Sequence, residues 1–340
     1  MTELLADHTT LRLGGPASSW VRATTTDEMV AAVSDTSGHV LILGGGSNMV
    51  VSDAGFKGTV VEVATTGVHA DYEGDPDPTY GTVLVTVAAG ESWDDLVVRA
   101  LEHGWVGIEA LAGIPGQVGA TPIQNVGAYG QDVAQTIVRV QVWDRARGAI
   151  RTMTSAECQF GYRTSRFKVA HRRFVVLAVT FRFQTGTLSG AVTHAELANA
   201  LGIKTDGRAP LVDVREVVLA LRRRKGMVLD PTDHDTWSVG SFFVNPVIDA
   251  AEVPPDAPAR PEPDGRVSTS AAWLIERAGF PKGYGHGPVS LSTKHSLALT
   301  NRGGARTDDL LELAREVRDG VERTHGIRLT NEPVLVGCTL

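Results

Sequence analysis

The chain has 340 residues, of which 42% are hydrophobic and 21% are charged, and its formal net charge is −7. This length exceeds one ordinary core, so two or three domains of a globular protein are expected. An acidic balance without a basic stripe excludes most nucleic-acid-binding classes, and two cysteines without a CxxC pattern argue against a disulfide framework or a zinc site.

The first residues, "MTELLADHTTLRLGG", lack the basic stretch and apolar run of a secretory signal. The longest apolar runs, such as "HVLILGGG", are too short to span a bilayer. We therefore expect a cytoplasmic protein in a reducing compartment, without membrane insertion and without a metal. We also expect a monomer.

In chain order, the first third alternates short elements. Strands are predicted at 19–24, 39–45 and 58–64, and two more are predicted around 80–90. The strand at 39–45 is expected to be buried. Thr26 is expected to cap a short helix, and Ser92 to begin a second helix that Gly104 ends.

Beyond a glycine-rich stretch at 111–130, strands are predicted at 137–145 and 173–184. Helices are expected to start at Thr193 and at Asp213, each with a glutamate three residues on. The remaining predicted elements are a helix at 271–278 capped by Ser270, a strand at 295–301, an amphipathic helix at 307–324 and a final strand near 332–337.

Strands and helices intermix without a regular strand–helix alternation, which predicts an α+β fold rather than a doubly wound sheet. Two segments, 71–79 and 249–265, are predicted to be loops or small insertions. The second is rich in proline and acidic residues, so we expect it to be mobile.

Two glycine clusters are candidates for ligand binding. "LGGGSNMV" at 43–50 follows a predicted strand, where successive N–H groups form an anion-binding concavity or merely a tight turn. "LAGIPGQVGATPIQNVGAYG" at 111–130 contains no charged residue, and its glycines suit backbone pressed against a flat or phosphorylated ligand. Together the clusters indicate a large cofactor bound mainly by backbone, with Gln124 and Asn125 as neutral amides for a heterocycle edge.

Three shorter motifs hold candidate reactive groups. In "FGYRTSRF" at 160–167, Arg163 is a candidate carboxylate or phosphate clamp, although solvated arginines in a turn are commoner. Ser241 in "GSFFVNP" is either merely buried or a proton donor in an apolar pocket. Glu332 in "TNEPVLVG" starts an apolar strand and could orient a substrate if it lies in a cleft.

Two further features are interpreted as structural. Cations at 222–225 end a predicted helix, where they complement its dipole, although Lys225 could reach a phosphate. "DPTDHD" at 230–235 invites a metal assignment but is interpreted as a solvated loop.

Five motifs occur in a fixed order: "LGGGSN", "LAGIPGQVGATPIQNVGAYG", "GYRTSRF", "GSFFVNP" and "NEP". Together they closely resemble the UDP-N-acetylenolpyruvoylglucosamine reductase family, and the resemblance spans nearly the whole chain. It implies a two-subdomain FAD-binding module of the vanillyl-alcohol-oxidase type with a smaller α+β substrate domain. The implied boundaries are 1–67 with the returning strand 327–340, 68–224, and 225–326.

The resemblance also implies the reaction. NADPH would reduce FAD, and the hydride would pass to C3 of UDP-N-acetylglucosamine enolpyruvate, giving UDP-N-acetylmuramate for peptidoglycan synthesis. The FAD would be bound non-covalently, because neither cysteine lies in the glycine segments and no nearby histidine offers an attachment point.

Site residues are carried over by motif match. Ser241 resembles the family's proton donor to C2, and Arg163 and Glu332 resemble the pair that stabilises the developing carboxylate charge. The substrate-binding positions implied are Tyr162, His194, Lys225, Asn245 and Glu276. The implied FAD-binding positions are Gly44, Gly45, Gly46, Ser47, Asn48, Gly113, Ile114, Pro115, Gly116, Gly119, Ala120, Gln124, Asn125, Gly127 and Ala128.

The chain departs from the family in one place. The family's extended-loop branch carries a tyrosine in a "TYGDL"-like segment that closes over the substrate diphosphate, whereas this chain reads "THAEL" with His194. A histidine can donate a hydrogen bond to phosphate in either protonation state.

Two other functions are compatible with parts of the pattern. An FAD oxidase of the same fold class would be reoxidised rapidly by air. A non-catalytic sugar-nucleotide binding protein would keep Lys225 and Asn245 but show no flavin spectrum, and the joint presence of Arg163, Ser241 and Glu332 argues against it.

Overall fold

The computed structural model describes residues 3–34, 39–73, 81–262 and 264–340. The chain divides into two compact units, each assembled from segments that are distant in sequence. Unit 1 comprises Met1–Ser18, Gly46–Lys57 and Arg224–Leu340. Unit 2 comprises Ser19–Gly45 and Gly58–Arg223.

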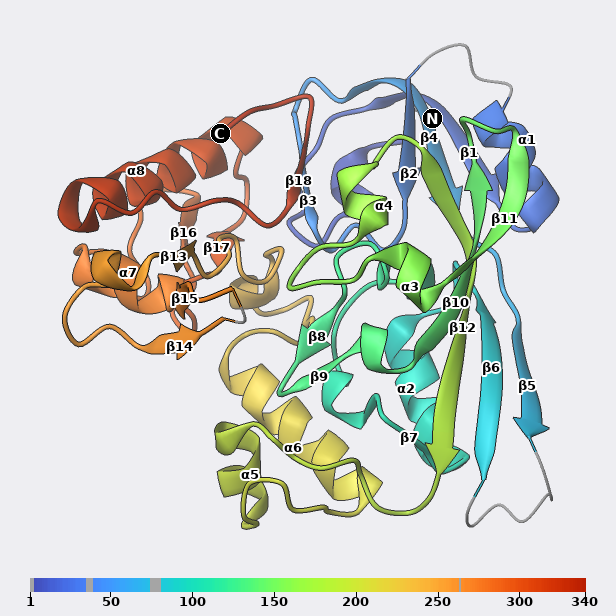
Figure 1. The fold of residues 1–340 in the computed structure, drawn as a ribbon. Helices are drawn as coiled ribbons and strands as arrows, with labels where there is room; N and C mark the ends of the chain where they lie inside the picture. Colours follow the sequence, from blue (N-terminus) through green and yellow to red (C-terminus); the bar gives the residue numbers. More distant parts are fainter. Residues whose placement is uncertain (1–2, 35–38, 74–80, 263) are drawn as a thin grey trace. The chain divides into compact units, whose positions relative to one another are not determined.

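A long antiparallel sheet dominates unit 2. Its strand order is β11-β10-β12-β6-β5, and the short strand β7 pairs with β12. These strands form the tall ribbons of Figure 1 and have the bounds β5 Val68–Glu73, β6 Thr82–Ala88, β7 Trp105–Val106, β10 Ile137–Asp144, β11 Ala149–Thr154 and β12 Phe174–Thr185. The antiparallel pairing confirms the expected α+β class.

The remaining elements of unit 2 are short strands, helices and 3₁₀ turns. They are β1 Ala17–Ala23, α1 Thr26–Ser34, β2 Val40–Leu43, β4 Phe56–Val63, α2 Trp93–Glu102, η2 Glu109–Leu111, η3 Val118–Ala120, β8 Gly127–Ala128, β9 Gln131–Asp132, η4 Val133–Gln135, α3 Ser155–Cys158, α4 Arg166–Val169, α5 Ala195–Leu201 and α6 Leu211–Arg224. Strands β1 and β4 begin in unit 1.

Aromatic side chains fill the core of unit 2 between the long sheet and α2. Phe181 and Phe183 on β12 have ring centroids 5.6 Å apart. Trp93 at the start of α2 lies 6.1 Å from Phe181, and Trp105 stacks on Phe183 at 5.9 Å. All four side chains are fully or almost fully buried, so α2 is held against the sheet by large apolar groups.

The predicted buried strand at 39–45 is an edge strand in the structure. Strand β2 forms a small sheet of order β1-β4-β2 and pairs in parallel with β4 alone. Only Leu43 of β2 is buried, while Val40–Ile42 are half-buried. No strand of the described residues pairs with the outer edge of β2. The apolar side chains of this strand are therefore only partly buried.

Unit 1 packs short strands around the long helix α8. Its elements are η1 Leu5–His8, β3 Met49–Val51, η5 His234–Thr236, β13 Val247–Ile248, η6 Ala250–Glu252, β14 Ala259–Pro261, β15 Val267–Thr269, α7 Ala271–Arg277, β16 Val289–Leu291, β17 Leu299–Asn301, α8 Thr307–His325 and β18 Val334–Val336. Strand β18 pairs in parallel with β3, so the C-terminal strand lies beside the second part of the N-terminal glycine cluster (Figure 1).

The apolar stripe predicted for 307–324 is the centre of this core. Leu310, Ala314, Val317 and Val321 are fully buried. They belong to a cluster that also contains Phe242 and Phe243 of the "GSFFVNP" motif. The two phenylalanines thus anchor Ser241 to the core of unit 1.

Three predicted helix starts are displaced. Thr25, not Thr26, accepts the N–H of Glu28 at the start of α1. Helix α5 begins at Ala195 rather than Thr193, whose hydroxyl instead packs against Gly130. Helix α6 begins at Leu211 rather than Asp213, because the carbonyl of Pro210 already accepts the N–H of Val214.

The two predicted insertions contain regular structure. The first three residues of 71–79 complete β5, and the rest of that segment lies outside the described residues. Segment 249–265 forms η6 and β14, and β14 pairs with β15, so it is not a featureless loop. None of the helices in the described ranges combines the length and apolar character of a membrane span.

Candidate functional site

The two glycine clusters meet inside unit 2. A Cβ added to Gly45 would lie 2.9 Å from the Cα of Gly116, so only glycine permits this approach of the two segments. A Cβ on Gly44 would lie 3.0 Å from Oε1 of Gln117. The clusters therefore form one continuous backbone surface in this unit.

The turn at Gly113 is held by side chains from two helices. The N–H of Gly113 donates to Oδ1 of Asp94 on α2 at 2.6 Å. Its carbonyl accepts from Nη2 of Arg222 on α6 at 3.3 Å, and Arg215 of the same helix pairs with Asp94 at 3.3 Å. Burial lowers the pKa of Arg222 to about 10, which leaves this guanidinium charged at neutral pH.

Other backbone groups of the same segment bond within the protein. Gly119 donates to the carbonyl of Ala89 at 2.8 Å, and a Cβ there would lie 2.5 Å from the Cβ of Ala89. Ala120 donates to the carbonyl of Gln117 at 3.0 Å and is exposed. Gly119 is therefore required for the close packing of this segment against Ala89, whether or not it also contacts a ligand.

Asn125 links three parts of unit 2. It is buried, its Nδ2 donates to the carbonyl of Gly161 at 3.3 Å, and its Oδ1 accepts from the N–H of Ala134 at 3.0 Å. The side chain thereby ties the glycine-rich segment to the "GYRTSRF" motif.

Arg163 lies against the end of the glycine-rich segment. Its Nη2 donates to the carbonyl of Gly127 at 3.0 Å, and its own carbonyl accepts from Nζ of Lys168 at 3.0 Å. Its φ of 52° is in the left-handed region, which costs free energy for a residue with a Cβ. Tyr162 is more than half exposed, with its ring centroid 5.8 Å from Cζ of Arg163.

His194 lies directly before α5 and beside the same segment. Its side chain makes no capping hydrogen bond. Its ring meets the ring of Tyr129 edge-on, with centroids 5.3 Å apart. The chain therefore places this histidine next to the "GAYG" turn.

In unit 1, the segments carrying Ser241 and Glu332 are neighbours. The N–H of Glu332 donates to the carbonyl of Phe242 at 2.8 Å, and Val244 donates to Thr330 at 3.0 Å. On its other side, Phe242 donates to the carbonyl of Leu297 at 2.8 Å. Two of the three predicted catalytic residues are thus brought together by backbone pairing, while Arg163 belongs to unit 2.

The second half of the first glycine cluster joins this arrangement. Val334 of β18 donates to the carbonyl of Asn48 at 3.0 Å. The carbonyl of Gly46 accepts from Thr10, whose hydroxyl donates to the carbonyl of Ser238 at 2.6 Å. Residues 46–48 therefore lie within the hydrogen-bonded frame that supports Ser241 and Glu332.

The predicted substrate-binding positions of unit 1 differ in their surroundings. Oδ1 of Asn245 accepts the N–H of Ala271 at 3.0 Å, so this side chain fixes the start of α7. Glu276 on α7 is exposed. Lys225 precedes Gly226, where an added Cβ would lie 3.1 Å from the carbonyl of Asp235.

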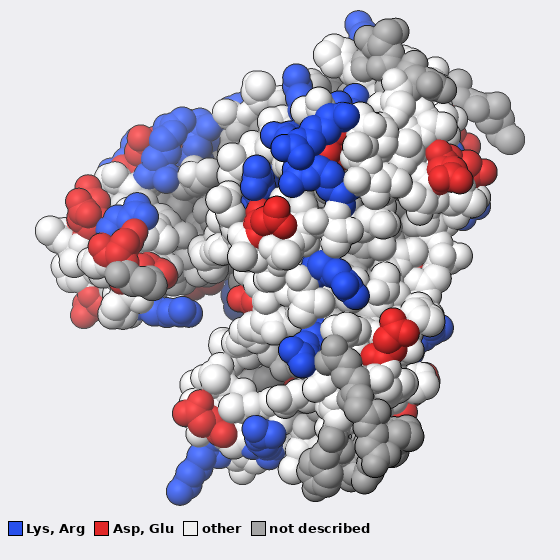
Figure 2. Space-filling model, turned by 45° about the vertical axis from the view of Figure 1, so that its right-hand side comes forward, with Lys and Arg blue, Asp and Glu red and all other residues white. Residues whose placement is uncertain are grey.

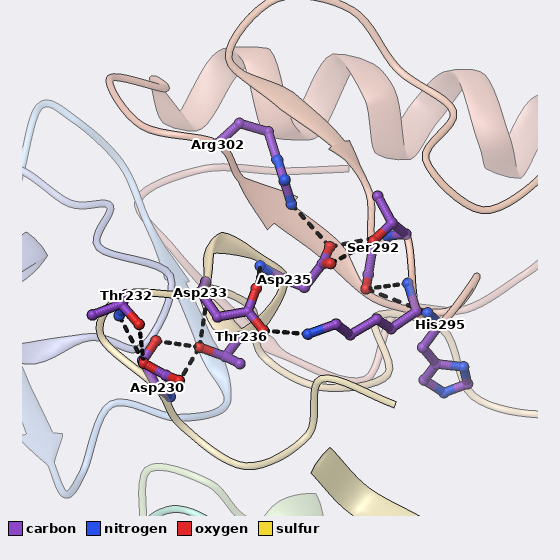
Figure 3. Close-up of polar contacts among 10 residues, drawn as sticks. Asp230, Thr232, Asp233, Asp235, Thr236, Ser292, His295 and Arg302 are labelled. Atoms are coloured by element: carbon purple, nitrogen blue, oxygen red, sulfur yellow. Dashed lines mark hydrogen bonds and ion pairs between the residues drawn. The ribbon is translucent and has the colours of Figure 1, made fainter. Parts of the chain in front are cut away.

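The acidic stretch 230–235 is an ordered hydrogen-bond network, not the solvated loop that we predicted (Figure 3). Asp235 is buried and accepts from the N–H of Thr293 at 2.9 Å, its hydroxyl at 2.5 Å, and Nη1 of Arg302 at 2.9 Å. Asp233 pairs with Lys294. The network joins the turn before Ser241 to loop 292–296.

Asp235 is charged in this setting. Burial alone favours the neutral acid, but the hydrogen bonds from Thr293 and Ser292 and the charge of Arg302 together hold the pKa of Asp235 below its ordinary value. The acidic residues are therefore satisfied by cations and hydroxyls of the protein. Within the described residues, no group of three or more His, Cys, Asp or Glu side chains is arranged to hold a metal.

The glycine surface of unit 2 fits a large cofactor with hydrogen-bond donors. Nε2 of Gln117 donates to the carbonyl of Val63 at 2.8 Å, which fixes the side chain. Its Oε1 is buried and has no hydrogen-bond partner among the described residues. A buried acceptor beside Gly44 indicates a ligand that brings an O–H or N–H group to this surface, as the ribityl hydroxyls of FAD do.

Sequence reasoning missed the side chains that support this surface. Asp94 and Arg222 were interpreted only as parts of helices, and Asp235 as part of a loop. The signal for Asp94 was weak, because an acidic residue in a first turn is common without any such role. Their partners are distant in sequence, so only the fold reveals them.

Family models match both ends of the chain. Residues 17–154 match a model described as an FAD binding domain. Residues 230–336 match a model described as the C-terminal domain of UDP-N-acetylenolpyruvoylglucosamine reductase.

Full-length relatives and a solved structure agree with these matches. Proteins named UDP-N-acetylenolpyruvoylglucosamine reductase from Thermobifida fusca and Cutibacterium acnes are each 55% identical to this chain over 99% of its length. The matches cover 97% and 90% of those proteins, respectively. The crystal structure of the enzyme of that name from Thermus caldophilus has a TM-score of 0.67 at 26% identity and covers 99% of this chain and 98% of its own.

Proposed function

Because the chain belongs to the UDP-N-acetylenolpyruvoylglucosamine reductase family, we propose that Ser241, Arg163 and Glu332 carry its reaction. The chain is an FAD-dependent oxidoreductase that uses NADPH to reduce UDP-N-acetylglucosamine enolpyruvate, a step of peptidoglycan precursor synthesis. The observation that supports the residue assignment is the backbone pairing of the Ser241 and Glu332 segments in unit 1.

In the proposed reaction, the cofactor supplies hydride transfer, and the side chains supply proton donation and charge stabilisation. The two glycine segments would hold FAD, which would supply the transfer of hydride from NADPH to C3 of the enolpyruvyl group. Ser241 then donates a proton to C2. A serine hydroxyl is a weak acid, so it must be held next to the carbon, and the fixed backbone of Phe242 provides that rigidity.

Arg163 opposes the charge that develops on the substrate carboxylate. Hydride arrival pushes electron density onto this carboxylate, where a fixed guanidinium acts most strongly. The hydrogen bond from Arg163 to the carbonyl of Gly127 orients the guanidinium before substrate binds. Glu332 completes the polar set at the carboxylate.

The remaining site positions fall into two groups. We assign Lys225, Asn245, Glu276, Tyr162 and His194 to the substrate, with the cations and amide serving the diphosphate. We assign Gly44–Asn48, Gly113–Gly116, Gly119, Ala120, Gln124, Asn125, Gly127 and Ala128 to FAD. The division at 1–67, 68–224 and 225–326, with 327–340 returning to the first part, remains our proposal for the domains.

Location and assembly are part of the proposal. Both cysteines are free thiols, and burial raises the pKa of Cys158 to about 12, so this thiol is a poor nucleophile. This supports a cytoplasmic protein with non-covalent FAD. We propose a monomer of 36.1 kDa, which light scattering on the holoenzyme would test.

Stopped-flow measurement of Ser241→Ala tests the catalytic assignment. FAD reduction by NADPH should proceed at close to the normal rate, because the flavin surface is unchanged. Reoxidation of the reduced flavin by the enolpyruvyl substrate should slow by about two to four orders of magnitude, the range expected for loss of a positioned proton donor.

Each other outcome of this experiment has a distinct meaning. If both half-reactions slow together, Ser241 is structural. If neither slows, another group donates the proton. Rapid reoxidation of the wild-type reduced flavin by air would instead indicate an oxidase of the same fold class.

A further inference from the structure

The hairpin at the end of the glycine-rich segment contains a buried carboxylate oxygen that has no hydrogen-bond partner within the described residues. Strands β8 and β9 pair Gly127 with Asp132 and Ala128 with Gln131. Oδ1 of Asp132 is buried and has no hydrogen-bond partner within the described residues. Among the side-chain atoms of the described residues that share this condition, it is the only carboxylate oxygen.

The residues on either side of Asp132 make hydrogen bonds within the protein. Oε1 of Gln131 accepts from the N–H of Ala110 at 2.8 Å, and its Nε2 donates to Glu109 at 2.9 Å. The N–H of Val133 donates to the carbonyl of Val126 at 3.0 Å. Hydrogen bonds on both sides of Asp132 therefore hold the backbone of this hairpin in place.

Asp132 itself is half-buried, but a buried carboxylate oxygen without a donor is costly for the free protein. It can only accept hydrogen bonds, and leaving it without a donor costs about 1–3 kcal/mol or more. Such groups are retained where a ligand supplies the missing partner. The ligand must bring a neutral or cationic donor, so the carboxylate and diphosphate of the substrate are excluded by charge repulsion.

The position of the hairpin points to FAD as the molecule that brings the donor. Asp132 pairs directly with Gly127, whose carbonyl holds Arg163 and which lies in the segment assigned to FAD. A flavin offers donors at the N3–H of its ring and at its ribityl hydroxyls. We propose that Asp132 binds FAD by accepting a hydrogen bond from one of these groups, an inference that rests on the FAD assignment of segment 111–130.

The proposal predicts opposite effects on the free and the bound protein. In Asp132→Ala, the apoprotein should be as stable as wild type or more stable, because a buried carboxylate oxygen without a hydrogen-bond donor is removed. The dissociation constant of FAD should rise about 10- to 100-fold, the equivalent of one hydrogen bond to a charged acceptor. Asp132→Asn keeps one acceptor oxygen and should show a smaller increase.

The experiment combines three measurements on full-length protein reconstituted with FAD. Fluorescence titration gives the FAD dissociation constant, thermal denaturation gives the melting temperature of the apoprotein, and spectroelectrochemistry gives the flavin midpoint potential. The potential should rise in Asp132→Ala if the partner is N3–H, and stay unchanged if it is a ribityl hydroxyl. Asp95→Ala, an exposed carboxylate on α2, is the control and should change none of these values.

Two results would overturn the proposal. An unchanged FAD dissociation constant in Asp132→Ala would show that the carboxylate faces water or another group. A lower apoprotein melting temperature together with weaker FAD binding would make Asp132 a structural residue. Neither result would affect the Ser241 half-reaction test, so failure here is distinguishable from failure of the proposed catalytic roles.

Discussion

At the scale of single residues, Arg163 is the member of the predicted catalytic set whose guanidinium donates to a backbone carbonyl, that of Gly127. This hydrogen bond orients the guanidinium before any ligand arrives. Arg163→Lys keeps the positive charge but loses the planar guanidinium, which can donate two parallel hydrogen bonds to a carboxylate. We expect kcat to fall about a hundredfold or more while KM changes little, as steady-state kinetics would measure. A near-normal kcat would remove Arg163 from the catalytic residues.

His194 is the residue at which this chain departs from the tyrosine of the extended-loop branch. It is exposed and lies edge-on to Tyr129 at the start of α5. If it binds the diphosphate, His194→Ala should raise the KM for the enolpyruvyl substrate about fivefold, the equivalent of one hydrogen bond of about 1 kcal/mol. The rate of flavin reduction by NADPH should not change. Asn199→Ala, also exposed on α5, is the matched control, and equal KM values in both variants would contradict the assignment.

The sequence motifs predict site residues but not the side chains that support them. Arg163, Ser241 and Glu332 each lie in a short motif with a recognisable order along the chain, and their catalytic roles stay a prediction. The contacts of Asp94 and Asp235 could not be predicted, because an acidic residue has the same local sequence pattern whether it is solvated or bonded within the protein. Their partners Gly113 and Thr293 come near only in the folded chain.

At the scale of elements, the sequence predicted the types of the helices and strands more accurately than the residues at which they begin and end. The stripe of α8 and the cap of α7 at Ser270 were predicted correctly, because periodicity and a capping side chain act locally. The starts of α5 and α6 were wrong, because Gly130 and Pro210 impose tertiary and backbone constraints that a capping pattern does not contain.

On the face that Figure 2 draws, several Lys and Arg side chains lie close together among acidic ones. In unit 2, the carboxylate of Asp144 pairs with two arginines, Arg151 and Arg173. Asp144 at the end of β10 is fully buried. It accepts two hydrogen bonds from Arg173, at 2.9 and 2.8 Å, and one from Arg151 at 3.2 Å. These bonds join β10, β11 and the start of β12.

Asp144→Asn should therefore destabilise unit 2. Breaking a buried pair costs about 3–5 kcal/mol, and we expect about 3 kcal/mol because the arginines are partly exposed and can be hydrated. Hydrogen bonds from Arg173, then from Arg151, hold the pKa of Asp144 far below its ordinary value of 3.8 despite burial. Its contribution is complete above that value and is lost as pH falls towards the lowered pKa of the folded state.

Urea denaturation at several pH values would measure this contribution. The difference in unfolding free energy between wild type and Asp144→Asn should be constant near neutral pH and shrink below about pH 4. A difference that grew on acidification would contradict the assigned sign. Glu157→Gln, whose carboxylate is partly exposed, provides a control with a smaller effect.

The pairing of β18 with β3 can be tested by a single backbone change. Val334→Pro removes the N–H that donates to Asn48, while Val334→Ala keeps it, and the valine side chain is largely exposed. We expect the proline variant to bind FAD more weakly by about tenfold and the alanine variant to be normal, as fluorescence titration would show. Equal affinities would mean that the hydrogen bond to Asn48 does not shape the cofactor surface.

At the scale of the whole molecule, the chain divides into two compact units, and the facing glycines Gly45 and Gly116 both belong to unit 2. A cofactor that binds the folded chain and not the unfolded chain stabilises the folded chain by mass action. Calorimetry should therefore show a higher melting temperature for the holoenzyme than for the apoprotein, and the difference should grow with the concentration of free FAD. Equal melting temperatures in both forms would contradict the FAD assignment.

The β3–β18 pairing has a consequence for how the protein is made. On the ribosome, β3 emerges early, but its parallel partner is among the last segments to be translated. Until then the carbonyl of Asn48 lacks the hydrogen bond from Val334 that it has in the finished molecule. Capture of the cofactor by a nascent chain should accordingly be late, occurring only after synthesis of β18, and arrested chains that stop short of residue 334 should fail to retain flavin.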